Sequence, residues 1–329
     1  MSQYFMKNMQ LFLLFSLINL INTLSFILST KKLSKMSKSL LKLSDKSTNK
    51  EKNIDDVFSL NSIRGTLIRQ EETIIFALIE RAQFKKNNKI YNNDGWNLKK
   101  PDSSSASLLD WMFIQTESIH SQVRRYTSPD EHPFFDEYIA EPILPSLDFP
   151  KVLIDTKSQV DVNDDIMNWY INKIIDRLCD EGDDEQYGSS VTCDVAAMQS
   201  ISRRIHYGKY VAESKYLSDP DKYTQLVYNN DVQGVLDLLT NTEVERNVLR
   251  RAYKKASTYG QDIGGNRGGE KLIEPSLISD IYRDMIIPLT KDVEIRYLYH
   301  RVGNTNVPPV EKYLHLCSAP FDAFDNFEL

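Results

Sequence analysis

Apolar side chains recur at helical spacing through most of the chain, and polar stretches separate the repeats. In residues 55–83, Ile63, Leu67, Ile74 and Leu78 fall close to a 3.6-residue period, which predicts an amphipathic helix. The same pattern predicts further helices at 107–126, 162–179, 192–217, 220–229, 231–239, 241–259 and 275–302. No run of strictly alternating residues has the length of a strand, so the pattern predicts an all-α fold.

The predicted helices define one domain, residues 54–303. Within it, the polar stretch 84–106 is rich in Asn, Asp, Gly, Pro and Ser, and we interpret it as a loop. The segment GGNRGGE at 264–270 lacks a preceding strand and the spacing of a phosphate-binding loop, so we interpret it as a connector. The tail 304–329 contains two consecutive prolines and is expected to be mobile.

The first 53 residues are typical of a targeting segment and are excluded from the fold. Lys7 precedes an apolar run from residue 11 to about 28, which matches a secretory signal. The following stretch is rich in Ser and Lys and has no acidic residue before Asp45, as in organelle transit peptides. Together they indicate a bipartite address for a plastid reached through the secretory route, with no membrane anchor in the mature protein. The alternatives are plain secretion and a retained anchor, because the apolar run is just long enough to span a bilayer.

Composition narrows the function classes. Hydrophobic residues make up 41% of the chain, enough for a real core, and the net charge of −6 argues against a general nucleic-acid binder. The three cysteines, Cys179, Cys193 and Cys317, form no CxxC pair and have no histidine at metal-ligand spacing. We therefore expect reduced thiols, no structural metal and no disulfide framework.

Four groups of polar residues stand inside the predicted helices. The second group spans eleven residues, or three turns plus about 20°, and the third and fourth groups span four residues each. Both spacings keep the members of a group on one helix face. Cations from separate helices, together with a carboxyl group that can be neutral, favour a substrate with two carboxylates. In chain order the groups are Arg64; Arg204 with Lys215; Asn241 with Glu245; and Thr290 with Glu294.

Most of these residues also have an ordinary structural interpretation. Arg204 beside Arg203 is typical of a solvated helix surface. Asn241 stands where a residue caps a helix, and the segment NTEVE has the character of a capping box. Lys215 is close in sequence to acidic residues with which it can pair, and Thr290 with Glu294 can be a routine helix face. His206, next to this set, is expected to be a packed structural histidine.

Longer stretches outweigh these ordinary interpretations, because several of them occur in the order known from one family. The segments SLNSIRGTLIRQEETIIFALIERAQF, HSQVRRYTSPDEHPFF, SISRRIHYGKYVAESKY, NTEVE and IIPLTKDVEIRYL resemble the all-helical chorismate mutases of fungi and plants. The resemblance covers roughly residues 57–301. It implies a homodimeric helical bundle with catalytic and regulatory sites in each subunit. It also implies the rearrangement of chorismate to prephenate, on the branch towards phenylalanine and tyrosine.

The reaction accounts for the types of the candidate residues. Chorismate carries two carboxylates, an enol ether oxygen and a ring hydroxyl, and its rearrangement is intramolecular and pericyclic. No nucleophile, metal or redox cofactor is needed. The enzyme has to hold the flexible side chain over the ring and stabilise the negative charge that grows on the ether oxygen.

The resemblance assigns a role to each candidate. Arg64 and Arg204 would bind the two carboxylates through paired hydrogen bonds, a geometry that suits the planar guanidinium, with a hydroxyl donor from Thr290. Lys215 and a protonated Glu294 would donate to the ether oxygen. The other two residues, of types that match the family's, would contact the ring hydroxyl and add a polar contact: Glu245 and Asn241.

A regulatory site is also implied. Members of the family often bind an aromatic amino acid at the dimer interface, so tryptophan, tyrosine and phenylalanine are the expected effectors. Arg124 and Arg125 match the family's arginine pair, and Gly188, Ser189 and Thr192 resemble its effector-binding segment ahead of a long helix. A helix N-terminus with small residues leaves amides available for a carboxylate. A plain loop with a structural arginine pair is the alternative.

Departures from the family pattern cluster at this regulatory segment. Glu185 and Gln186 stand where fungal members tend to carry amides, and Cys193 replaces a charged position. The identity of the effector therefore does not follow from the sequence. A second class of function also stays open, a non-catalytic or secreted helical interaction protein derived from the same fold. The complete catalytic set favours the enzyme, because a binding protein has no need for a pair of donors to an ether oxygen.

Overall fold

The structure is a computed structural model that describes residues 60–147, 152–156, 158–260, 273–309 and 313–314. The predicted targeting segment, the predicted connector at 264–270 and Cys317 lie outside these residues. Among the described helices, none is both long enough and apolar enough to cross a membrane.

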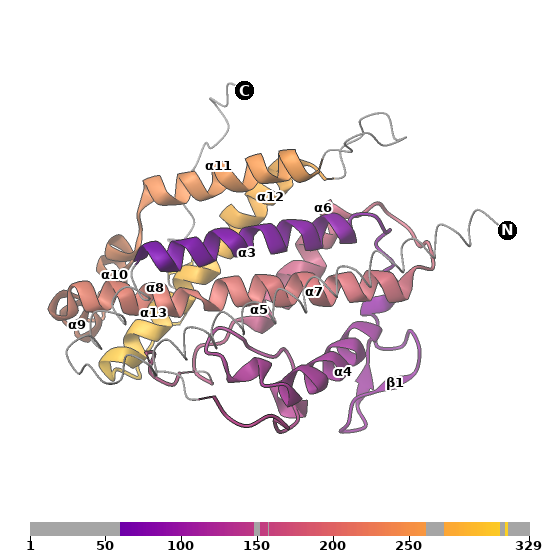
Figure 1. Ribbon diagram of the computed structural model, residues 1–329, viewed down its shortest axis with the longest axis horizontal. Coiled ribbons are helices and arrows are strands. Elements are labelled where there is room, and N and C mark those ends of the chain that lie inside the picture. Colours follow the sequence, from indigo (N-terminus) through magenta and orange to yellow (C-terminus); the bar gives the residue numbers. More distant parts are fainter. Residues whose placement is uncertain (1–59, 148–151, 157, 261–272, 310–312, 315–329) are drawn as a thin grey trace, which may run out of the picture. The chain divides into compact units, whose positions relative to one another are not determined.

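Helices dominate the described chain, which confirms the all-α prediction. Figure 1 shows the long ones as a stack in which α11, α3, α7 and α4 follow one another, and the contacts between neighbours agree with this order. The helices are α3 (Leu60–Arg81), α4 (Leu108–Gln122), α5 (Asn163–Trp169), α6 (Ile175–Leu178), α7 (Tyr187–His206), α8 (Gly208–Ser218), α9 (Pro220–Tyr228), α10 (Val232–Leu239), α11 (Thr242–Tyr259), α12 (Pro275–Ile281) and α13 (Ile287–Val302).

Shorter elements connect or interrupt these helices. Five-residue π-helical segments join α5 to α6 and α12 to α13. Three turns are 3-10 helices. The polar loop predicted at 84–106 contains a two-stranded antiparallel hairpin in which Leu98 pairs with Ala106. Its strands have two residues each, too short for alternation to reveal them. The short elements are η1 (Asn88–Tyr91), β1 (Leu98–Lys99), β2 (Ser105–Ala106), η2 (Arg125–Thr127), η3 (Asp136–Tyr138), η4 (Tyr170–Ile174) and η5 (Tyr282–Ile286).

One predicted helix, 192–217, is corrected by the structure. Helix α7 begins five residues earlier, at Tyr187, and ends at His206, and α8 starts at Gly208. The earlier start follows an acidic turn in which the Asp184 carboxylate accepts from the Gln186 amide at 3.0 Å. Periodicity missed these residues because Gly and Ser carry no apolar signal.

Polar caps fix several other helix boundaries. Ser107 and Asp110 form a capping box at the start of α4, with the Asp110 amide donating to the Ser107 hydroxyl at 3.0 Å. Asp219 caps α9 immediately before Pro220, a residue suited to the first helical position. Gly303, with φ 83°, takes the left-handed conformation that ends α13.

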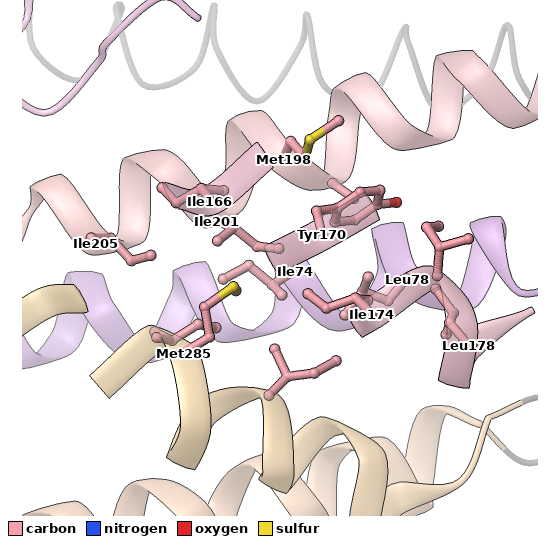
Figure 2. Packing of buried hydrophobic residues seen from close by; sticks show 14 of the residues in the cluster. Ile74, Leu78, Ile166, Tyr170, Ile174, Leu178, Met198, Ile201, Ile205 and Met285 are labelled. Carbon is pink, nitrogen blue, oxygen red and sulfur yellow. The ribbon is translucent and has the colours of Figure 1, made fainter. Parts of the chain in front are cut away.

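The core lies between α3, α5 with η4, α7 and the α12–α13 region. Figure 2 shows Ile74 and Leu78 of α3 in one cluster with Ile201 of α7 and Met285 of η5. A second cluster surrounds the C-terminal half of α13 and packs it against α8, α9 and α10. Tyr313, within the tail for which mobility is predicted, belongs to this second cluster and is 1% exposed. Residues beyond 314 lie outside the described part.

Candidate active site

The site is built where α8 crosses α13. A Cβ atom at Gly208, the first residue of α8, would lie 3.0 Å from Thr290 Cγ2 and 3.2 Å from the Thr290 carbonyl oxygen. Only a residue without a side chain allows the two backbones to come this close. This packing places Lys215, two turns beyond Gly208 on α8, beside Glu294, one turn beyond Thr290 on α13. Sequence reasoning missed Gly208. A glycine inside the helical segment HYGK could have indicated that another backbone comes close at this position.

Lys215 and Glu294 form the centre of the site. The Lys215 ammonium lies 3.5 Å from the Glu294 carboxylate and also donates to the carbonyl oxygen of Leu239. Glu294 is 5% exposed. Burial raises the pKa of Glu294 above its ordinary value, while Lys215 and Lys291 oppose the shift without cancelling it. The pair therefore combines a fixed cation with a carboxyl group that is biased towards its protonated form.

Glu245 is held at the same site by a residue that the sequence reasoning missed. Lys291 of α13 lies 3.0 Å from Glu245 Oε1, so this ion pair joins the start of α11 to α13. Both residues are buried, and Glu245 Oε2 has no hydrogen-bond partner among the described residues. Lys291 follows Thr290 directly in the sequence. A lysine inside an otherwise apolar helix face was the signal that could have found it.

Arg204 is buried at the end of α7 with much of its hydrogen-bonding capacity unused. It is 6% exposed, and its Nε and Nη1 atoms have no hydrogen-bond partner in the described part of the chain. Burial lowers the pKa of Arg204, against the opposite influence of Tyr282, Glu71 and Glu294. Native proteins seldom leave buried donors unpaired, so this guanidinium is suited to an anion that arrives from outside.

A buried acid ties the two helices that flank Arg204. Glu71 of α3 is 0% exposed, and Arg251 of α11 donates to both of its carboxylate oxygens, at 2.7 and 2.5 Å. Lys255, one turn further along α11, lies 3.3 Å from the same carboxylate. This fully paired carboxylate fixes α3, which carries Arg64, against α11, which carries Glu245.

The remaining candidates are placed less tightly. Arg64 is exposed on α3 and makes no hydrogen bond or ion pair with a described residue. Asn241 caps α11 by accepting from the Val244 amide at 3.0 Å, as its ordinary interpretation predicted. The Thr290 hydroxyl donates to the Ile286 carbonyl oxygen at 2.6 Å. Contacts thus join Lys215, Glu245 and Glu294 through α13, whereas no contact joins Arg64 or Asn241 to them.

Comparison with known proteins agrees with this geometry. Residues 186–295 match the family model described as chorismate mutase type II. A chloroplastic chorismate mutase 1 of Petunia hybrida is 42% identical over 250 residues, which are 74% of this chain and 76% of the relative. The chain belongs to the type II chorismate mutase family.

Solved structures of chorismate mutases share the fold. A Candida albicans chorismate mutase in complex with L-Trp aligns with a TM-score of 0.71 at 42% identity, covering 78% of this chain and 97% of that one. AtCM1 with tyrosine bound in its allosteric site aligns with a TM-score of 0.67 at 40% identity, covering 75% and 97%. The predicted family and the all-α bundle are therefore confirmed.

The arginine pair expected at a regulatory site lies at the end of α4. Arg124 takes a left-handed backbone conformation, with φ 69°, and donates to the carbonyl oxygen of Pro145. Arg125 donates to Glu131 at 3.0 Å and to Gln199 of α7 at 2.7 Å. Arg125 is thus tied to the middle of the helix whose last turn carries the catalytic candidate Arg204.

The other regulatory candidates lie at the opposite end of α7. Gly188, Ser189 and Thr192 form its first turns, and the Thr192 hydroxyl donates to the Gly188 carbonyl oxygen at 2.7 Å. Gln199, which holds Arg125, is seven residues beyond Thr192, or roughly 10 Å along the helix axis. No contact within the described chain joins the two groups.

One cluster has the composition of a metal site but not the geometry. His132, Asp161 and His206 place possible ligand atoms within 4.8 Å of one another. The two imidazole rings are stacked, however, with centroids 3.8 Å apart and planes 11° apart. Ligating lone pairs lie in the ring planes, so nearly parallel stacked rings cannot both point at one ion. His206 Nε2 also accepts from the Val162 amide at 3.2 Å, as expected for a packed structural histidine.

Proposed function

We propose that this chain converts chorismate to prephenate by an intramolecular Claisen rearrangement, in the synthesis of phenylalanine and tyrosine. The carrying observation is the pair of half-buried Lys215 and buried Glu294, 3.5 Å apart, together with a buried Arg204 whose Nε and Nη1 lack partners among the described residues. These groups match the demands of a reaction that needs positioning and charge stabilisation rather than a nucleophile.

Binding of the substrate begins with its two carboxylates. Arg204 offers two unpaired N–H donors in a buried setting, where a charge-assisted hydrogen bond is strong. Arg64, exposed on α3, takes the second carboxylate, and Thr290 adds a hydroxyl donor when it turns from the Ile286 carbonyl. Holding both carboxylates brings the enolpyruvyl side chain over the ring and removes most of the entropy cost of the step.

Rate enhancement comes from the donors to the ether oxygen. As the C–O bond breaks, negative charge grows on that oxygen, and the Lys215 ammonium donates to it. Glu294 donates from its other side while protonated, which the raised pKa favours. Glu245 Oε2, buried and without a partner among the described residues, accepts from the ring hydroxyl, and Asn241 adds a polar contact at the rim.

A direct assay tests the proposal. The purified protein is mixed with chorismate in the presence of a chelator, and the loss of chorismate and appearance of prephenate are followed. We expect turnover that Arg204→Ala reduces by roughly 10²–10³. Folded protein that gives no conversion above the uncatalysed rate would contradict the proposal and favour a binding role for the same fold.

Regulation by aromatic amino acids is part of the same proposal and implies a homodimer. Large apolar side chains are exposed on α4 and in the segment after it: Trp111 at 37%, Ile119 at 64%, Val123 at 43% and Ile143 at 73%. Burial of this surface against a second copy would stabilise a dimer. A second copy also provides a way to bring Arg124 and Arg125 of one chain to the first turn of α7 in the other.

Two measurements test this extension. We expect sedimentation to give a dimer that Ile119→Lys dissociates, because a charge in an apolar interface is costly. Tryptophan, tyrosine and phenylalanine should each be titrated into the assay, with Arg125→Ala as the variant that weakens the response. Rates that do not change with any of the three would refute the regulatory proposal and leave the catalytic one intact.

The proposed location is a plastid reached through the secretory route, and it rests on the sequence of residues 1–53. A fluorescent protein fused behind residues 1–53 should accumulate in the plastid. Export of the fusion would support secretion instead, and a cytosolic signal would contradict both.

A further inference from the structure

A tyrosine from the C-terminal segment reaches the back of the catalytic helix. Tyr313 is 1% exposed and packs in the second core cluster with Ile295 and Leu298 of α13. Its hydroxyl donates to Asp292 Oδ1 at 2.5 Å. The match to the family model ends at residue 295, so Tyr313 lies outside the matched region.

Asp292 is a buried acid that depends on this contact. It is 0% exposed, and its other partner is Arg296, one turn along the same helix, at 2.9 Å from Oδ1 and 2.7 Å from Oδ2. Arg296 fixes Asp292 only relative to its own helix. Among these partners, Tyr313 is the one that anchors the carboxylate to another part of the chain.

Helical geometry places this anchor opposite the proposed catalytic face. Two residues along a helix turn the side-chain direction by about 200°. Asp292 is two residues after Thr290 and two before Glu294, so its side chain leaves α13 on nearly the opposite side from both. A displacement of α13 at Asp292 therefore moves Thr290 and Glu294 towards or away from Lys215 of α8.

We propose that Tyr313 is a positioning residue for the reaction. Through Asp292 it fixes the rotation of α13 about its own axis and the position of α13 against α8. This in turn sets the distance between the Glu294 carboxyl group and the Lys215 ammonium. The inference rests on the proposed function, because it concerns the step in which Glu294 donates to the ether oxygen. Tyr313 does not touch the substrate.

The experiment compares two tyrosines of the same cluster in the full chain. Tyr313→Phe keeps the ring and removes the hydroxyl that holds Asp292. Tyr299→Phe is the matched control, because Tyr299 is also buried on α13 and its hydroxyl donates to Asn230 at 2.9 Å, away from Asp292. Each variant loses one hydrogen bond from a tyrosine hydroxyl, buried at Tyr313 and partly buried at Tyr299. Melting temperature, kcat and KM are measured for each.

The expected outcome separates positioning from stability. Both variants should melt somewhat below the parent. Tyr313→Phe should lower kcat roughly tenfold, since a donor displaced by about 1 Å costs up to 10²-fold, with KM changed less than about threefold. Tyr299→Phe should leave kcat within about twofold of the parent. Equal kcat in Tyr313→Phe and the parent, or equal losses in both variants, would overturn the positioning role.

A second variant tests the same inference in case Tyr313→Phe folds poorly. Asp292→Asn leaves the Tyr313 ring in place but replaces the charged acceptor, so it should lower kcat with the same small change in KM. Unchanged kcat in this variant would also overturn the inference. A parent protein without turnover refutes the proposed function and the positioning role together, whereas an active parent with indistinguishable variants refutes only the latter.

Discussion

Two buried arginines in this protein have opposite surroundings. Arg81, at the end of α3, is 0% exposed, and Arg204, at the end of α7, is 6% exposed. Arg81 donates to Asp194 at 2.7 Å and to the carbonyl oxygens of residues 84–86 at 2.9–3.2 Å. Arg204 keeps Nε and Nη1 without a partner among the described residues.

The difference separates a structural charge from one kept for a ligand. Burial lowers the pKa of Arg81, but Asp194, together with the smaller influences of Tyr91, Cys179 and Tyr170, outweighs burial, so the net shift is upward. At Arg204 burial prevails and the pKa is lowered, because no acid is paired with it. A buried cation whose partners are all supplied by the chain stabilises the fold, whereas one that lacks partners costs stability and is suited to an incoming carboxylate.

The largest expected effect tests the structural half of this comparison. Arg81→Met leaves Asp194 buried with only the hydroxyls of Tyr91 and Tyr170 to compensate it. Removing one partner of a buried ion pair typically costs about 3–5 kcal/mol of unfolding free energy. Arg204→Met, the same change at the other arginine, should leave the unfolding free energy unchanged or raised. Denaturant unfolding of both variants checks this, and equal losses would contradict the comparison.

For turnover of chorismate, we expect the arginine without partners to matter more than an arginine that is paired. Arg204→Met should reduce kcat/KM by about 10²–10³, the usual cost of one preorganised donor in a buried site. Arg203→Met is the control on the next residue, because Arg203 pairs with Asp130 at 3.0 Å and Glu131 at 3.3 Å instead of facing the site. Chorismate turnover is measured for both. Similar losses at 203 and 204 would mean that Arg204 does not bind the substrate.

The same contrast explains what the sequence could and could not predict. Helices such as α9 and α11 were placed within two residues, because apolar periodicity and caps such as Asn241 are local signals. The start of α7 was missed, because Gly188 and Ser189 carry no periodic signal. The need for a glycine at 208 comes from the close approach of Thr290, a contact between residues far apart in sequence.

Site residues divide along similar lines. The sequence predicted Arg204, Lys215, Glu245 and Glu294 as candidates because they belong to family motifs and share helix faces. Lys291 was missed because its importance lies in a contact across helices with Glu245. The sequence does not show which buried arginine has hydrogen-bond partners for its N–H groups, because Arg81 and Arg204 both lie near the ends of ordinary helices.

The next prediction concerns Glu294, a buried acid whose pKa stays raised although Lys215 and Lys291 oppose the shift. Burial raises the pKa of Glu294, and in the proposed mechanism its protonated form donates to the ether oxygen. Turnover should therefore fall as pH rises through the pKa of Glu294 in the substrate complex, by up to about tenfold per unit. Glu294→Gln can donate at any pH and should flatten this decline even if its maximum is lower. The measurement is kcat against pH at saturating chorismate. A variant with the parent's alkaline limb would show that another group titrates.

The smallest expected effect concerns His206, a buried group whose partners suit the neutral form. Its Nε2 accepts from the Val162 amide, which leaves Nδ1 to donate to the Ser202 carbonyl oxygen at 2.9 Å. Burial, the stacked His132 ring and Lys209 lower the pKa of His206 well below its ordinary value, against the opposite influence of Asp161. A proton on His206 would break this arrangement.

The sign of the pH dependence follows from that direction. The folded pKa is below the ordinary value of about 6.5, so the unfolded chain takes up the proton first on acidification. The stability that neutral His206 contributes is full above about pH 6.5 and is lost as pH falls towards the folded pKa, by up to about 1.4 kcal/mol per unit. His206→Gln can still accept from the Val162 amide and cannot titrate, so its unfolding free energy should fall less between pH 6.5 and 5. His120, whose pKa is lowered to about 4 by burial and Arg125, leaves part of the slope in both proteins. Parallel curves for parent and variant over this range would show that His206 does not carry the acid sensitivity.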